Sequence, residues 1–161
     1  MGIKILKDAD YIIWDFDGVI KDSMKVKSYA FEKLFMPFGK ELSKNVRLHH
    51  ENNGGMSRFD KLHIYLELAG QEPLYSLVNE YAEKFSLLVK QKVIDSDWVE
   101  GVLDFLKTNH KKQEYFLVTA TPQLEIEYIL KKLKIENYFT EIIGSPTKKS
   151  NAVKNILNKY G

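Results

Sequence analysis

Two acidic residues stand two positions apart in the segment WDFDGVIKDS, residues 14–23, where an apolar run ends. A carboxylate such as that of Asp15 can attack phosphorus and form an aspartyl-phosphate, which divides one slow displacement into two easier ones. The carboxylic acid of Asp17, on the same side of an extended chain, can protonate the leaving oxygen and later deprotonate water. A bare pair of this kind more often caps a turn, so the surrounding elements must decide between the two interpretations.

The same pair is a candidate site for a hard metal ion. The carboxylate oxygens of Asp15 and Asp17 suit Mg²⁺, and a bound cation would cancel the repulsion between a carboxylate nucleophile and a phosphate. Gly18 follows directly and lets the chain turn, so that backbone N–H groups can approach phosphate oxygens. Together these residue types predict a phosphate site that carries a magnesium ion.

The chain around this pair alternates between strand and helix patterns, with one long helical interruption. An apolar run over residues 10–16 predicts a buried strand that ends near Phe16. Amphipathic stripes between residues 21 and 94 predict only helices. After these we expect, in order, a helix over residues 98–108, a strand over 114–120, a helix with Thr121 as N-cap and Pro122 at its first position, a strand over 140–144 and a helix from Ser150.

This order predicts an α/β core that is interrupted by a helical insertion. Strands alternating with helices favour a parallel sheet, so residues 1–20 and 95–161 form the expected core and residues 21–94 form the insertion. The carboxyl ends of parallel strands meet at one edge of a sheet, where ligands bind. Asp15 and Thr119 would both emerge at that edge.

Composition limits the classes of protein. The 161 residues are 44% hydrophobic and 29% charged, and a net charge of +2 is too small to argue for nucleic acid as a partner. The sequence has no cysteine, which excludes disulfides, thiolate zinc sites and a thiol nucleophile. No apolar run approaches the roughly 18 residues of a membrane span, and the first residues show no signal-peptide pattern. We therefore expect a cytoplasmic enzyme or binding protein with no membrane partner.

Three segments, in order, resemble the motifs of the haloacid dehalogenase-like (HAD) phosphohydrolase superfamily. DFDGVI with DS shortly after, at residues 15–23, is similar to the first motif, and YFLVTATP with Thr119 resembles the second. The third motif is a lysine at the start of a helix. It is matched by GSPTKKSNAVKNIL, in which we assign Lys149 and keep Lys148 as the alternative. Glu100 stands in VEGVLDFLK where the family usually has proline.

The resemblance implies a Rossmann-like parallel-sheet core with an inserted α-helical cap domain, and it implies a role for each matching residue. Asp15 would be the nucleophile and Asp17 the acid/base, and both would hold Mg²⁺. Thr119 would give its hydroxyl and Ala120 its backbone N–H to the phosphoryl group. Lys149 would set a positive charge against nucleophile and phosphate. Without the motifs, Thr119 is an ordinary strand-end threonine and Lys149 a surface lysine.

The helical insertion resembles the cap of the subgroup that contains β-phosphoglucomutase and phosphoglycolate phosphatase. In NNGGMSRFDKL, Gly55 would let the chain approach the site, and Arg58 would reach the distal part of the substrate. A solvated Arg58 in a first helical turn is an equal alternative. His49 and His50 either contact substrate or lie on a solvated helix face. Because adjacent histidines do not share a helix face, a two-histidine metal site is disfavoured.

As a whole, the resemblance implies a Mg²⁺-dependent phosphohydrolase that cleaves a small phosphorylated metabolite through an aspartyl-phosphate, with sugar phosphates among the candidates. A phosphosugar mutase is the alternative within enzymes, and a non-catalytic binding or regulatory protein is the alternative outside them. In this family a fourth, acidic motif follows the lysine helix, whereas the sequence stops at NILNKYG. We therefore expect a fragment of a longer protein that binds Mg²⁺ weakly and by itself shows little or no phosphatase activity. The substrate and the oligomeric state stay open.

Overall fold

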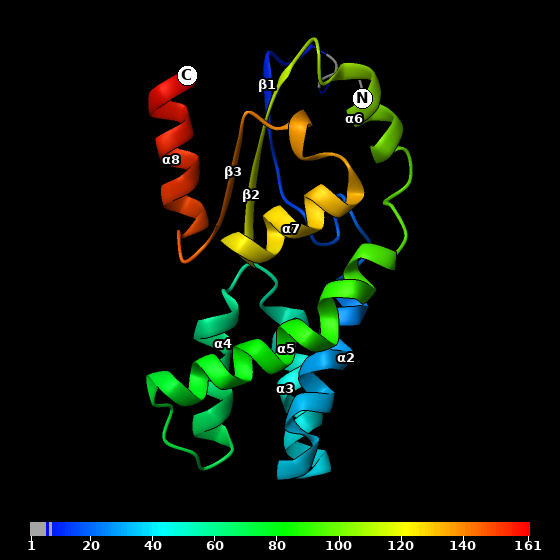
Figure 1. Ribbon diagram of the computed structural model, residues 1–161. Helices are drawn as coiled ribbons and strands as arrows, with labels where there is room; N and C mark the ends of the chain where they lie inside the picture. Colours follow the sequence, from blue (N-terminus) through cyan, green and yellow to red (C-terminus); the bar gives the residue numbers. More distant parts are fainter. Residues whose placement is uncertain (1–5, 7) are drawn as a thin grey trace. The chain divides into compact units, whose positions relative to one another are not determined.

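The structure is a computed structural model that describes residue 6 and residues 8–161. The chain divides into two compact units (Figure 1). The first, called here the α/β unit, joins Met1–Asp22 to Asp97–Gly161, and the second, the helical unit, is Ser23–Ser96. The insertion that the sequence predicts at residues 21–94 lies within two residues of the helical unit at both ends.

Within the described residues, three parallel strands form the sheet of the α/β unit, in the order β1-β2-β3. They are β1 (Tyr11–Trp14), β2 (Glu114–Pro122) and β3 (Glu141–Ser145). Ile13 lies opposite Phe116 in the first pair of strands, and Val118 lies opposite Ile143 in the second. Because all three strands run the same way, their carboxyl ends lie at one edge of the sheet. The α/β class predicted from the order of elements is confirmed.

One helix covers the first face of this sheet. α8 (Lys149–Tyr160) packs through Ala152 and Ile156 onto Phe116 and Val118 of the central strand. Figure 1 shows α8 on the opposite side of the strands from the other helices of this unit. Its apolar residues are spaced at one helical turn, so a single face of α8 is buried.

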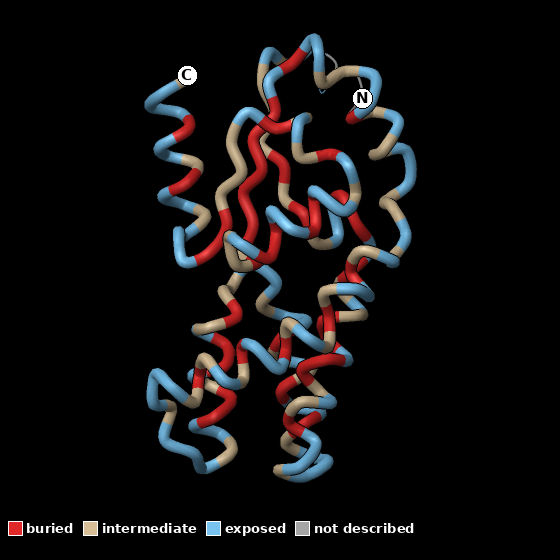
Figure 2. The backbone as a smooth tube through the Cα atoms, in the orientation of Figure 1, coloured by how far each residue is buried: buried red, intermediate tan, exposed pale blue. Residues whose placement is uncertain are grey.

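Two further helices cover the second face of the sheet. α6 (Val102–Asn109) places Phe105 against Trp14 and Tyr115, with ring centroids 5.8 Å and 6.5 Å apart. α7 (Gln123–Leu133) buries Ile126, Ile129 and Leu130, and the short 3-10 helix η2 (Glu136–Tyr138) leads on to β3. Figure 2 shows that the central strand β2, covered on both faces, is buried along most of its length.

The described residues of the helical unit form helices and turns. The helices are α2 (Met24–Phe35), the 3-10 helix η1 (Met36–Phe38), α3 (Lys40–Asn52), α4 (Arg58–Leu68) and α5 (Tyr75–Asp95). Phe31 and Phe85 lie at the centre of this unit, with ring centroids 4.0 Å apart. Gly39, with φ of +115°, ends the helical stretch that begins at Met24, so α3 is a separate helix. In the described part of the chain, no helix is both long enough and apolar enough to span a membrane.

The junction between β2 and α7 differs from the sequence prediction. We expected Thr121 to cap the helix and Pro122 to be its first residue, but β2 continues to Pro122 and α7 begins at Gln123. A proline disfavours helical backbone in the residue before it, and Pro122 itself is extended, with ψ of 143°. Thr121 is therefore a strand residue, and its side chain is available to the edge of the sheet where the strands end.

Gly144, near the end of β3, is packed too closely for any other residue. A Cβ at this position would lie 2.6 Å from the carbonyl oxygen of Thr121 and 2.8 Å from the backbone nitrogen of Gln123. We predict that Gly144→Ala lowers the free energy of unfolding by about 1–3 kcal/mol, the usual cost of overpacking. Urea denaturation followed by circular dichroism measures this change. Gly55→Ala is the control, since a Cβ there meets no atom within 4 Å; equal losses in both variants would contradict the prediction.

Candidate active site

Asp15 follows the last residue of β1, and both of its carboxylate oxygens are engaged. Oδ1 accepts a hydrogen bond of 2.8 Å from the backbone N–H of Phe16. Oδ2 accepts one of 2.5 Å from Nζ of Lys149, so the two side chains form an ion pair. Both side chains are partly exposed, so the pair remains accessible to solvent at the edge of the sheet.

A tight turn follows Asp15 and sets the direction of the next acid. The carbonyl oxygen of Phe16 accepts hydrogen bonds from the N–H groups of Ile20 and Lys21, at 2.8 Å and 3.2 Å. Gly18 has φ of +74°, which side-chain-bearing residues rarely adopt, and its own N–H donates to the carbonyl oxygen of Lys21 at 2.8 Å. The turn expected at Gly18 is therefore present.

Asp17 meets the end of β2 through a residue that the sequence analysis assigned to another role. The hydroxyl of Thr121 donates to Oδ2 of Asp17 at 3.2 Å, although the two residues are 104 positions apart. Thr121 is 3% exposed, so this hydroxyl is held in place by the surrounding core. The sequence places this threonine before a proline at the end of a strand, a pattern that we interpreted as a helix cap.

Thr119 lies two residues before this contact and is also buried. Its Oγ1 accepts a hydrogen bond of 3.2 Å from the N–H of Thr121, which closes a small turn around Ala120. The register between β2 and β3 shifts between Val118 and Pro122, so this stretch departs from the regular ladder. The structure thus brings Thr119 and Thr121 to the edge that carries the two aspartates.

Lys149 is the first residue of α8, and it is the lysine that reaches Asp15. Lys148 stands at the N-cap position, and it is exposed. The other end of α8 is fixed to β3, because Lys159 and Tyr160 both donate hydrogen bonds to Oε1 of Glu141. These hydrogen bonds, the one from Lys159 above all, lower the pKa of the Glu141 carboxyl. The sequence analysis assigned the lysine of the third motif to Lys149 and kept Lys148 as the alternative. In the structure, Lys149 is the one that pairs with Asp15.

The described residues hold no group of three or more His, Asp or Glu side chains that could hold a metal ion. Two carboxylates, Asp15 and Asp17, therefore make up the acidic donor set of this edge in the described part of the chain. Mg²⁺ is commonly held by one or two carboxylates together with water and substrate phosphate, so this donor set fits a weakly held magnesium ion.

Of the two substrate residues predicted in the helical unit, Arg58 is buried and Gly55 has open space around it. Arg58 is 6% exposed; its guanidinium donates to Oγ of Ser86 at 2.5 Å and lies over the ring of Phe85. The solvated alternative for Arg58 is therefore wrong. Gly55 has open space around its Cα and no positive φ, so no steric requirement for glycine exists there.

The two histidines of the helical unit also have partners within it. His49 Nδ1 lies 2.9 Å from the hydroxyl of Tyr65. His50 is 4% exposed, and its Nδ1 lies 2.8 Å from Nζ of Lys61, which is itself buried. A solvated helix face for His50 is therefore wrong.

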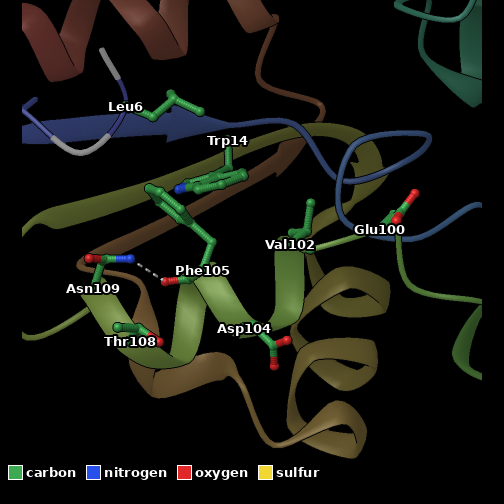
Figure 3. A pocket seen from close by; sticks show the side chains of 9 residues that line it. Leu6, Trp14, Glu100, Val102, Asp104, Phe105, Thr108 and Asn109 are labelled. Carbon is green, nitrogen blue, oxygen red and sulfur yellow. Dashed lines mark hydrogen bonds between the residues drawn. The ribbon is translucent and has the colours of Figure 1, made fainter. Parts of the chain in front are cut away.

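A cavity of about 400 Å³ lies elsewhere in the α/β unit, against β1 and α6 (Figure 3). Its lining residues are Leu6, Trp14, Glu100, Gly101, Val102, Asp104, Phe105, Thr108 and Asn109. Asp15, Asp17, Thr119 and Lys149 do not line it. The cavity is therefore distinct from the acidic edge and is not assigned to its chemistry.

Comparisons with known proteins agree with this geometry. Residues 12–161 match the haloacid dehalogenase-like hydrolase family. A curated relative, the phosphorylated carbohydrates phosphatase of Thermotoga maritima, is 25% identical over 133 residues, which are 82% of this chain and 59% of the relative. The chain thus spans less than two thirds of that relative's length.

Two solved structures share the fold. A predicted phosphoglycolate phosphatase of Haemophilus somnus has a TM-score of 0.65 and 15% identity, over 95% of this chain and 72% of its own. A Bacillus subtilis protein assigned as a HAD-hydrolase, solved bound to magnesium, has a TM-score of 0.60 and 15% identity, over 95% of this chain and 74% of its own. At these identities the likeness is one of fold.

The site predicts different roles for two adjacent lysines in anion binding. Lys149 contacts Asp15 at the N-terminus of α8, where backbone N–H groups also favour anions, whereas Lys148 is exposed. We predict that Lys149→Ala weakens the binding of inorganic phosphate by roughly tenfold to a hundredfold, the value of a charge-assisted hydrogen bond. Lys148→Ala should change it less than about twofold. Isothermal titration calorimetry measures both, and equal losses would remove Lys149 from the site.

Proposed function

The chain belongs to the haloacid dehalogenase-like hydrolase family, and on that premise we propose that it is a phosphatase of small phosphorylated metabolites. The observation that carries the proposal is the ion pair between Asp15 and Lys149 at the edge where the strands end. A carboxylate nucleophile and a phosphate repel each other, and an ammonium group between them offsets that repulsion. Because the Thermotoga maritima relative is a phosphatase of phosphorylated carbohydrates, such compounds are the first candidate substrates.

In the proposed reaction, Asp15 and Asp17 divide the work. An Asp15 oxygen forms a bond to phosphorus while the bond from phosphorus to the leaving oxygen breaks, and Asp17 gives its proton to that oxygen. In the second step Asp17 takes a proton from water, whose oxygen attacks phosphorus and releases Asp15 as a carboxylate. Inorganic phosphate and the alcohol are the products, so atoms and charge balance.

The neighbouring residues hold these groups in position. The Thr121 hydroxyl donates to Asp17, which fixes the orientation of the carboxyl group. In the proposal, Thr119 and the N–H of Ala120 receive the phosphoryl oxygens, and Lys149 stays against the charge that develops during transfer.

Asp15 and Asp17 are also the residues that would hold a magnesium ion. When bound, such an ion supplies positive charge to the phosphoryl oxygens and to the Asp15 carboxylate. The fit of the two-carboxylate donor set supports this part of the proposal, and the Bacillus subtilis neighbour was solved bound to magnesium.

The helical unit is proposed as the cap that selects the substrate. In this proposal Arg58 reaches the distal part of the substrate, while one nitrogen of its guanidinium contacts Ser86. A role for Gly55 rests on the resemblance of its segment to the cap loop of the family.

The division of roles predicts different losses for the two aspartates. Asp15→Asn should abolish phosphate release from para-nitrophenyl phosphate, because an amide cannot act as the nucleophile. Asp17→Asn should lower kcat by roughly 10² to 10⁴ and change KM little, since the acid/base acts mainly in the transition state. Steady-state kinetics measure both losses, first with para-nitrophenyl phosphate and then with a panel of phosphorylated sugars and other metabolites.

Asp104→Asn, on the exposed side of α6, is the matched control and should keep the full rate. Turnover by Asp15→Asn near the unmodified rate would remove Asp15 from the nucleophile role. A change confined to KM in Asp17→Asn would contradict the acid/base assignment.

The small donor set predicts weak and phosphate-dependent magnesium binding. We expect Mg²⁺ alone to bind weakly by calorimetry, and its affinity to rise several-fold in the presence of inorganic phosphate, because the phosphate adds oxygen ligands and charge. Asp15→Asn should remove this coupling. Tight binding of Mg²⁺ without phosphate would show that other ligands complete the site.

A further inference from the structure

Gln123, the first residue of α7, uses its side-chain amide to hold the end of β3. Its Oε1 accepts a hydrogen bond of 2.6 Å from the backbone N–H of Gly144. Its Nε2 donates to the carbonyl oxygen of Ile142 at 2.8 Å and to Oε1 of Glu127 at 2.6 Å. Two of these contacts are to the backbone of a strand 19 and 21 positions away in sequence.

The two backbone contacts imitate a residue of a neighbouring strand. In a parallel ladder, one residue donates to a carbonyl group of the adjacent strand and accepts from an N–H two residues further along it. The Gln123 amide makes this pair of contacts with Ile142 and Gly144. It does so next to the register shift between Val118 and Pro122, where β2 departs from the regular ladder.

The close packing of Gly144 belongs to the same arrangement. A Cβ on Gly144 would lie 2.8 Å from both Cα and N of Gln123. The missing side chain of Gly144 therefore lets the backbone of Gln123 approach β3. At this separation the Gln123 amide contacts both backbone groups.

This contact lies at the start of the segment that leads to Lys149. After Gly144 the chain has four residues before α8 begins at Lys149, whose ammonium group meets Asp15. The distal end of α8 is attached to Glu141, at the beginning of β3. A fixed carboxyl end of β3 thus sets where α8 begins.

We propose that Gln123 is a positioning residue, which acts through the end of β3 to hold Lys149 against Asp15 and against a bound phosphate. The proposal rests on the proposed function for its catalytic consequence. Independently of catalysis, the proposal states that the position of the Lys149 ammonium group depends on the hydrogen bonds of the Gln123 amide to β3.

Two measurements test the two steps of this proposal, the contact of Gln123 with β3 and its effect on phosphate binding by Lys149. The first is hydrogen exchange of the Gly144 amide by NMR, which should become about tenfold faster in Gln123→Ala because the acceptor is lost. The second is inorganic phosphate binding in a double-mutant cycle of Gln123→Ala and Lys149→Ala. Gln123→Ala should weaken phosphate binding several-fold in the unmodified protein and leave it unchanged in the Lys149→Ala background.

Glu127→Ala is the matched control, because it removes the surface partner of Gln123 and keeps both contacts to β3. It should leave both measurements unchanged. Gln123→Glu is the second variant: it keeps an acceptor for Gly144 and loses the donor to Ile142. If Gln123→Ala does not fold, the cycle is run with this variant, and the same non-additivity with Lys149→Ala is expected.

The outcomes are separable from those of the proposed function. Unchanged exchange at Gly144, or an equal loss of phosphate binding in both backgrounds, would overturn the positioning role. Turnover by Asp15→Asn at the unmodified rate would overturn the phosphatase mechanism, while exchange and phosphate binding would still decide the role of Gln123. Where turnover is measured, non-additive losses in kcat for the same cycle support the role and additive losses contradict it.

Discussion

The parallel pairing of β2 with both β1 and β3 is the constraint on which the candidate site depends. It sets the carboxyl ends of all three strands at one edge, and each end carries residues of the candidate site. Asp15 follows β1, Thr119 and Thr121 lie among the last four residues of β2, and Lys149 follows β3. An antiparallel β3 would place Lys149 at the opposite edge. The apolar faces of α6, α7 and α8 bury the sheet that holds these strand ends together.

The ion pair between Asp15 and Lys149 contributes little to the stability of the fold, and we expect its larger effect to be on the binding of an anion. The side chains of Lys149 and Asp15 are 30% and 38% exposed, and exposed ion pairs contribute about 0–1 kcal/mol to folding. Its effect on an approaching anion is larger, because an unpaired Asp15 would repel a phosphate. The Asp17 carboxylate accepts a hydrogen bond from a different group, the hydroxyl of Thr121.

The sequence predicted the elements and the strand-end residues well, because both depend on local patterns. Apolar periodicity located the strands and helices, and the resemblance to the family motifs singled out Asp15, Asp17, Thr119 and Lys149. Contacts that depend on distant residues were missed. Nothing around Arg58 in the sequence indicates that Ser86 and Phe85 bury its guanidinium. The Thr-Pro pair has two local interpretations, a helix cap or a strand end, and its contact with the aspartate 104 positions away cannot be predicted from either.

The junction after β2 shows why such residues escape sequence patterns. A regular ladder would engage the backbone of residues 119–122 with β3, and their groups would then be unavailable to a ligand. The register shift interrupts the ladder between Val118 and Pro122, and Thr119 and Thr121 lie in this interruption. Buried polar groups without partners are costly, and the carbonyl oxygen of Ile142 and the N–H of Gly144 lie beside this irregular stretch. Gln123 supplies a donor and an acceptor from a side chain, so both of these backbone groups of β3 have a partner. A glutamine in a first helical turn carries no such signal by itself, because its role exists only where Gly144 approaches it.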